Sequence, residues 1–204
     1  MAKIDVTPCS GLQGLVIPGR YGAANGGPGV LLSERADLAL AAVMVRKGAG
    51  EALARHVRAA FGLDLPTTPR RAARGTLAFV WAGPGHWLAV TAGGDGSSFE
   101  KLLRHDLSNL ASISDQSDGC AVVRIAGARV RDALAKGVPV DLNPRAFAAG
   151  DAAVTTVGHI GVHLWQLDEA PTYEFAVFRS YAAAFWLWLI DSAAEFGVAV
   201  KAPS

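Results

Sequence analysis

The chain has 204 residues, of which 51% are hydrophobic and 18% charged, and its formal net charge is +1. This length suits one large domain, or two small ones around a shared core. No run of basic residues is longer than Arg70–Arg71, so we expect no nucleic acid partner. The low charge indicates that part of the surface does not face water.

Cysteine usage and the apolar runs indicate a cytoplasmic protein without membrane contact. Cys9 and Cys120 lie far apart in the chain and form no disulfide framework, which fits a reducing compartment. The N-terminus lacks the basic start and apolar core of a secretory signal. The longest apolar run, Tyr181–Ile190, is well short of the roughly 20 residues that cross a bilayer.

Residues 1–30 are predicted to form an extended arm. Seven glycines and two prolines lie between Gly11 and Gly29. Glycine raises the entropic cost of ordering a chain, so such a segment rarely folds on its own. We expect the arm to drape over the domain or over a partner, or to remain a poorly ordered terminus.

Residues 31–204 are predicted to form a single α+β domain of two similar units, about 31–110 and 111–200. The first unit is expected to hold a buried strand, a helix ended by Gly62, a loop, a hairpin around Gly83-Pro84-Gly85, and a helix capped by Ser97 or Ser98. The strand spans 38–46, the first helix 50–61 and the loop 65–74. The two hairpin strands span 76–81 and 87–91, and the second helix spans 99–107.

The order of elements begins again after residue 117. The second unit is expected to hold a strand at 120–125, a short helix at 128–135 and a loop at 136–151. Two β-branched runs follow at 154–157 and 160–167, with Gly158 between or within them, and then a third apolar run at 173–178. A helix begins at about Tyr181. Each unit therefore follows the order strand, helix, strand, strand, helix, although no exact sequence repeat accompanies it.

The final helix is apolar nearly all round. One stripe holds Phe185 and Leu189, and a second stripe holds Trp186 and Ile190. A helix of this kind is normally buried on more than one side. Since Trp186 and Trp188 point to different sides, at least one is a candidate interface anchor, and we predict a partner interface at Trp186, Trp188 and Ile190.

Candidate metal ligands and nucleophiles have simpler explanations. His159 and His163 lie four apart in a β-branched run, and on a strand that spacing separates the rings by roughly 13 Å, too far to share one ion. Cys120 opens a predicted strand and reads as a buried, inert thiol. Carboxylates that neighbour Ser, Gly, Pro or Asn are explained by turn chemistry; they are Asp115, Asp118, Asp141 and Asp151. No phosphate loop or dinucleotide fingerprint is present. We predict no catalytic, cofactor-binding or metal-binding residue.

Several segments together resemble the gamma subunit of heterotetrameric sarcosine oxidase. They are WAGPGHWLAV at 81–90, DQSDGCAVVRIAGARVRDALAKGVPVDLNPRAF at 115–147, and HIGVHLWQ with PTYEFAVFRSYAAAFWLWLIDSAAEFG between His159 and Gly197. VLLSERADLAL at 30–40 and DLP at 64–66 fit as well, so the resemblance spans about residues 30–197. The hairpin and the 115–147 segment are also similar to the folate-binding aminomethyltransferase of the glycine cleavage system. The implied fold is a shortened form of its folate-binding domain.

The resemblance implies a complex of alpha, beta, gamma and delta subunits, with the alpha subunit as the main contact. That complex oxidatively demethylates sarcosine with oxygen and tetrahydrofolate, giving glycine, hydrogen peroxide and methylenetetrahydrofolate. In the family, FAD, FMN and NAD belong to the alpha and beta subunits, the folate site to alpha, and zinc to delta. No folate-contacting position of the aminomethyltransferase matches a residue here.

We therefore expect a subunit of an oxidoreductase complex that has no catalytic residues of its own. Alone, the chain is expected to be poorly soluble or to self-associate. The alternatives are a stand-alone folate-binding or aminomethyl-transfer protein, and a subunit of an oxidase for another N-methyl amino acid.

Overall fold

The computed structural model describes residues 9–24 and 26–204, so the first eight residues of the predicted arm lie outside the described residues. Four α-helices, two short 3-10 helices and twelve strands follow one another in this part of the chain. In order they are β1 Gly19–Tyr21, β2 Val30–Glu34, β3 Leu38–Val45, α1 Gly50–Phe61, β4 Arg71–Arg74, β5 Leu77–Gly83, β6 His86–Ala92, α2 Gly96–Leu107, β7 Ala111–Asp115, β8 Cys120–Ala126, α3 Val130–Leu134, β9 Ala152–Val157, β10 Ile160–Asp168, β11 Thr172–Phe178, η1 Arg179–Tyr181, α4 Ala182–Ala193, η2 Ala194–Phe196 and β12 Val198–Val200.

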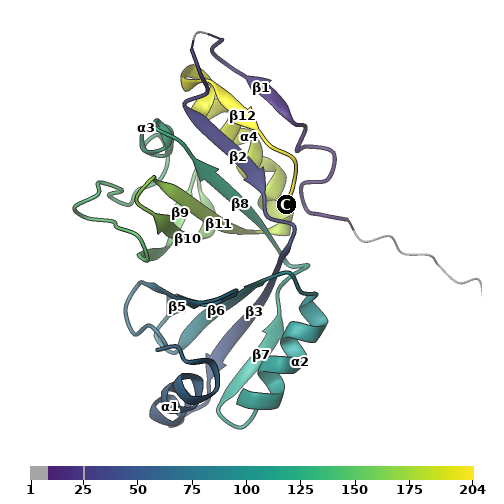
Figure 1. Cartoon of the computed structure of the whole chain (residues 1–204), viewed down its shortest axis with the longest axis vertical. Helices are drawn as coiled ribbons and strands as arrows, with labels where there is room; N and C mark the ends of the chain where they lie inside the picture. Colours follow the sequence, from purple (N-terminus) through teal and green to yellow (C-terminus); the bar gives the residue numbers. More distant parts are fainter. Residues whose placement is uncertain (1–8, 25) are drawn as a thin grey trace, which may run out of the picture.

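Two sheets stack on each other (Figure 1). The five-stranded sheet has the order β4-β5-β6-β3-β7, and all its neighbouring strands are antiparallel. The seven-stranded sheet has the order β1-β12-β2-β8-β11-β10-β9, and only β12 and β2 run parallel. The predicted α+β class is confirmed.

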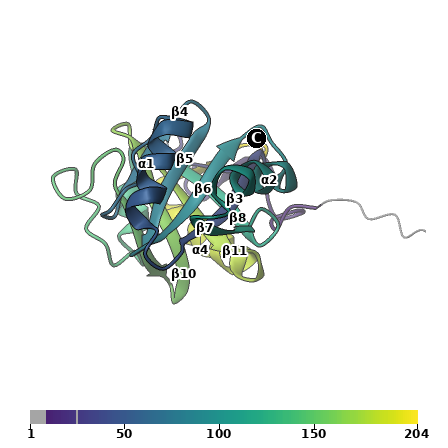
Figure 2. The same ribbon diagram turned by 90° about the horizontal axis from the view of Figure 1, so that it is seen from below.

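Helices cover the outer face of the five-stranded sheet, where α1 and α2 lie side by side in the view from below (Figure 2). Each turns one apolar stripe inward, from Leu53 and Val57 on α1 and from Phe99, Leu103 and Leu107 on α2. The N-cap of α2 is Asp95, whose carboxylate accepts the Ser98 N–H at 2.8 Å, so neither serine caps the helix as expected. The helix begins earlier for that reason.

A second apolar layer joins the two sheets. Alternate residues of the central strands point into it, because successive side chains of a strand face opposite sides. The five-stranded sheet contributes four of them and the seven-stranded sheet the other four; they are Leu40, Val80, Leu88 and Val90, and Val122, Ala152, Trp165 and Ala176. This layer makes the two units one body.

The two predicted units exchange strands at their borders. Residues 30–34 form β2 and pair with β8 of the seven-stranded sheet, while residues 111–115 form β7 and pair with β3 of the five-stranded sheet. A division at residue 110 therefore does not follow the sheets. The order strand, helix, strands, helix recurs as predicted, although each unit has three strands between its helices, since the expected loop at 65–74 contains β4.

The described part of the arm lies along α4. At its start, the backbone of Gly11 approaches the side chains of Ala121 and Ala182, and Leu12 is completely buried. At its end, the Ala23 N–H donates to the Ala194 carbonyl at 2.8 Å, just beyond α4. Between these points β1 pairs with β12. Of the alternatives, the arm drapes over its own domain.

Candidate partner surface

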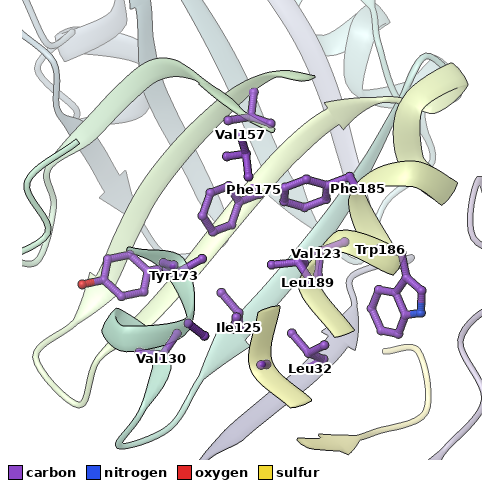
Figure 3. Close-up of a cluster of buried hydrophobic side chains, with 14 of the residues drawn as sticks. Leu32, Val123, Ile125, Val130, Val157, Tyr173, Phe175, Phe185, Trp186 and Leu189 are labelled. Atoms are coloured by element: carbon purple, nitrogen blue, oxygen red, sulfur yellow. The ribbon is translucent and has the colours of Figure 1, made fainter. Parts of the chain in front are cut away.

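Helix α4 has its apolar faces covered by its own chain. Phe185 and Leu189 face the seven-stranded sheet, where the Phe185 ring lies 5.4 Å from that of Phe175. Trp186 points away from Phe175 (Figure 3), yet it is only 3% exposed and belongs to the same buried cluster as Leu12 of the arm. Trp186 therefore does not face outward as the interface prediction requires, since its side chain is buried within its own chain.

Trp188 and Ile190 are partly buried against the same core. The Trp188 indole fills space left by two glycines, since a Cβ at Gly137 would lie 2.5 Å from the ring and one at Gly158 3.5 Å from it. It also stacks on Phe185, with ring centroids 6.4 Å apart. Neither residue offers a large free surface, and in the part of the chain that the structure describes no tryptophan is exposed.

Large apolar side chains are instead exposed where β11 runs into α4. Phe178 is 55% and Tyr181 53% exposed. Beside Phe178 is a hollow of about 110 Å³ in the seven-stranded sheet, on the face that the five-stranded sheet covers only in part. The residues that line the hollow are Cys120, Val154, Gly161, Val162, His163, Ala176 and Phe178. Exposed apolar surface of this kind is a candidate interaction site. We name it the Phe178 surface, comprising the hollow and Tyr181.

The two histidines of the rejected metal hypothesis do not lie on one strand as expected. His159 sits in the two-residue turn between β9 and β10 with φ 72°, next to Gly158, whereas His163 lies within β10. Burial lowers the pKa of His163, and its Nδ1 is enclosed without a hydrogen-bond partner among the described residues. This nitrogen is enclosed and so does not itself face the hollow, whose other lining residues are mostly apolar. No cluster of three or more metal-ligating residues occurs in residues 9–24 and 26–204.

A cavity of about 500 Å³ brings together several side chains that sequence reasoning treated singly. Cys9, Cys120, Asp115 and Asp118 all line it, between the first turn of α2 and the start of β8. Cys120 is partly buried and not fully buried as predicted; burial raises the pKa of its thiol, which favours the protonated form. Asp115 accepts the Ser117 N–H at 2.9 Å, so this carboxylate stabilises a turn.

The remaining predicted turn carboxylates lie elsewhere. Asp141 accepts the Asn143 N–H at 2.9 Å, and Asp151 accepts the Ala148 N–H at 2.8 Å and pairs with Arg70. The helices of the described chain include none long and apolar enough to span a membrane.

The fold matches two solved structures over most of its length. A heterotetrameric sarcosine oxidase from Corynebacterium sp. U-96, in complex with pyrrole 2-carboxylate, contains a chain that is 26% identical with a TM-score of 0.74, covering 86% of this chain and 88% of that one. The glycine cleavage system aminomethyltransferase T from Bartonella henselae is 14% identical with a TM-score of 0.60, covering 86% of this chain and 48% of that protein. The fold is therefore that of an aminomethyltransferase-like subunit.

Sequence comparison gives the family. The model of the sarcosine oxidase, gamma subunit family matches residues 46–195. A sarcosine oxidase subunit gamma from Arthrobacter sp. is 34% identical over 158 residues, which cover 76% of each chain. This chain belongs to the sarcosine oxidase gamma subunit family, and the resemblance found in its motifs is confirmed.

The Phe178 surface was missed because every apolar residue between Tyr173 and Phe178 looks like core when the strand is read alone. Phe178 lies on the same face of β11 as Ala176, which packs between the two sheets, and the local sequence does not show that Phe178 is left uncovered.

Proposed function

We propose that this chain is the non-catalytic gamma subunit of a heterotetrameric sarcosine oxidase. The complex would oxidatively demethylate sarcosine with oxygen and tetrahydrofolate, giving glycine, hydrogen peroxide and 5,10-methylenetetrahydrofolate. The observation that carries this proposal is the match to the solved heterotetrameric enzyme, which extends over 88% of the corresponding chain. FAD, FMN, NAD, zinc and tetrahydrofolate would bind to the other subunits.

Within the complex, the alpha subunit is the proposed main contact and the beta and delta subunits complete the assembly. The Phe178 surface supports this role, because Phe178 and Val154 are about half exposed around a hollow that the chain itself leaves unfilled. Aromatic side chains that fill or border such hollows are typical anchors of protein interfaces.

Co-expression with the three other subunits of the same organism tests the assembly. Phe178→Asp places a charge in the contact and is expected to reduce recovery of the gamma chain with alpha by at least about tenfold. Leu102→Asp is the matched control, since Leu102 is 51% exposed on α2 and lies outside this surface. Equal recovery of both variants would rule out the Phe178 surface, and no recovery of the wild-type chain would rule out the subunit role.

Titration of tetrahydrofolate into the purified chain separates this role from a stand-alone folate protein. We expect no binding to the gamma chain by itself. Tight one-to-one binding would favour the aminomethyl-transfer alternative. Comparing sarcosine with other N-methyl amino acids as substrates of the assembled complex identifies the oxidase, since faster turnover of another N-methyl amino acid would reassign it.

A further inference from the structure

A row of polar side chains crosses the layer between the two sheets. Trp165, Glu174 and Arg124 occupy directly paired positions on β10, β11 and β8. The Trp165 indole N–H donates to Glu174 Oε2 at 2.8 Å, and Arg124 donates to Glu174 Oε1 from Nε at 3.0 Å and Nη2 at 2.7 Å. Arg35, which follows β2, donates to the same Oε1 at 2.5 Å. Glu174 is only 3% exposed, so four donors hold a buried carboxylate.

The other acidic residue in this cluster is Asp37, which also binds Arg35. Asp37 binds the Arg35 guanidinium with both oxygens, at 2.7 Å from Nε and 2.9 Å from Nη2. Arg35 is thereby shared between Asp37 and Glu174, and its pKa is raised, chiefly by the hydrogen bond that it donates to Asp37. Both carboxylates are therefore already paired with arginines.

Arg71 adds a third guanidinium to these two carboxylates. It is paired with Val80 across β4 and β5, and since Val80 lies in the layer between the sheets, the Arg71 side chain enters that layer from the opposite sheet. Burial lowers the pKa of Arg71, with Glu174 acting against this effect and Arg124 and Arg35 adding to it. Within the described residues Arg71 forms no salt bridge and no side-chain hydrogen bond.

Three arginines against two carboxylates leave the cluster with one positive charge in excess. A half-buried guanidinium beside like charges is costly unless an anion accompanies it. The side chain of Arg124 is 37% exposed, so the cluster is open to the outside at that residue. One more singly charged oxyanion would balance the charge and accept the free donors.

We propose that Arg71 and Arg124 form a carboxylate-binding site at the open edge of the layer between the two sheets. A carboxylate fits better than a phosphate group, because it carries the single charge that is missing and matches the planar fork of a guanidinium. The carboxylate belongs either to an acidic side chain of a neighbouring protein chain or to a small organic acid. The proposal holds whether or not the chain is a sarcosine oxidase subunit.

Thermal unfolding of the purified full chain in acetate, against chloride at the same ionic strength, tests the site. Acetate is expected to raise the Tm of the wild-type chain, and Arg71→Gln to weaken its apparent affinity by at least about tenfold. Arg55→Gln is the matched control, because Arg55 is a 74% exposed arginine of α1 whose partner is Glu51. The control should keep the acetate response.

A second readout separates the two sources of the carboxylate. If a protein side chain occupies the site, Arg71→Gln weakens association with the other subunits by at least about tenfold, whereas Arg55→Gln does not. In chloride buffer Arg71→Gln should be at least as stable as the wild type, since it removes like-charge repulsion, while Arg124→Gln should be less stable because it strips a donor from Glu174. The proposal is overturned if Arg71→Gln destabilises the chain in chloride, or if Arg71→Gln and Arg55→Gln behave alike in both acetate response and association.

Discussion

Helices α1 and α4 have the same length of twelve residues and very different surroundings. Helix α1 packs one stripe on the outside of the five-stranded sheet and leaves its polar side to water (Figure 2). Helix α4 buries six residues and is enclosed by the seven-stranded sheet, by α3 and by the arm. An apolar pattern all round a helix therefore shows that it has several neighbours, and those neighbours can belong to the same chain.

The largest effect that tests this comparison is expected from Trp186→Ala. Because Trp186 is only 3% exposed, its truncation should lower the free energy of unfolding of the isolated chain by about 3–5 kcal/mol. His56→Ala on the exposed side of α1 is the control and should change it by less than about 0.5 kcal/mol. If both variants changed the free energy of unfolding in urea by similarly small amounts, Trp186 would not be packed in the core of the isolated chain.

Detaching the C-terminal end of the arm from α4 should lower the free energy of unfolding by less than Trp186→Ala does. Gly22 has φ 74°, and a Cβ there would overlap the backbone carbonyl of Ala194. Gly22→Ala is expected to destabilise the chain by about 1–3 kcal/mol and to expose the arm to limited proteolysis. Gly14→Ala is the comparison, since Gly14 also has a positive φ of 80° but has open space around it. Equal protease sensitivity of the two variants would contradict the close contact between arm and helix.

Substitutions on the narrow exposed strip of α4 should hardly change the free energy of unfolding. Leu187 is 55% exposed on that strip. Leu187→Gln is expected to change the free energy of unfolding by less than about 0.5 kcal/mol. A loss of several kcal/mol in thermal or urea unfolding would show that α4 is enclosed on this side too.

The smallest effect should be the pH dependence of stability that comes from His163, which lies on the face of the seven-stranded sheet opposite α4. The pKa of His163 is lowered by burial from an ordinary value of 6.5, so the unfolded chain takes up the proton more readily. The stability that neutral His163 provides is complete above pH 6.5 and falls as the pH drops through the lowered native pKa. His163→Phe should therefore lose less stability than the wild type between pH 7.5 and pH 5. Parallel profiles would show that His163 titrates as in water.

Strong local patterns predicted the helices and strands, whereas the sequence did not show which sheet each short strand joins. The stripe of Leu53 and Val57 with Gly62 after it gave α1 its observed ends. The five-residue strands β2 and β7 also alternate, with Val30 and Leu32 buried on one and Ala111 and Ile113 on the other, and this signal was available but short. Sequence spacing alone does not say which sheet such a strand joins, so the exchange between units was not predicted.

The candidate site was harder to predict for the same reason. The surroundings of Phe178 and Trp186 involve segments far away in the chain. Val154 of β9 lines the hollow beside Phe178, and Trp186 shares its buried cluster with Leu12 of the arm. The resemblance supplied the family, whereas the position of the partner surface depended on tertiary contacts that no local pattern contains.

The place of β12 sets an order for folding. All five strands of the smaller sheet lie between residues 38 and 115, so a nascent chain on the ribosome can complete that sheet early. The larger sheet cannot take its final form until residues 198–200 have been synthesised and inserted between β1 and β2. Contacts that span so much of the sequence form slowly. Until then β1 has no partner strand and β2 lacks one of its two neighbours in the sheet.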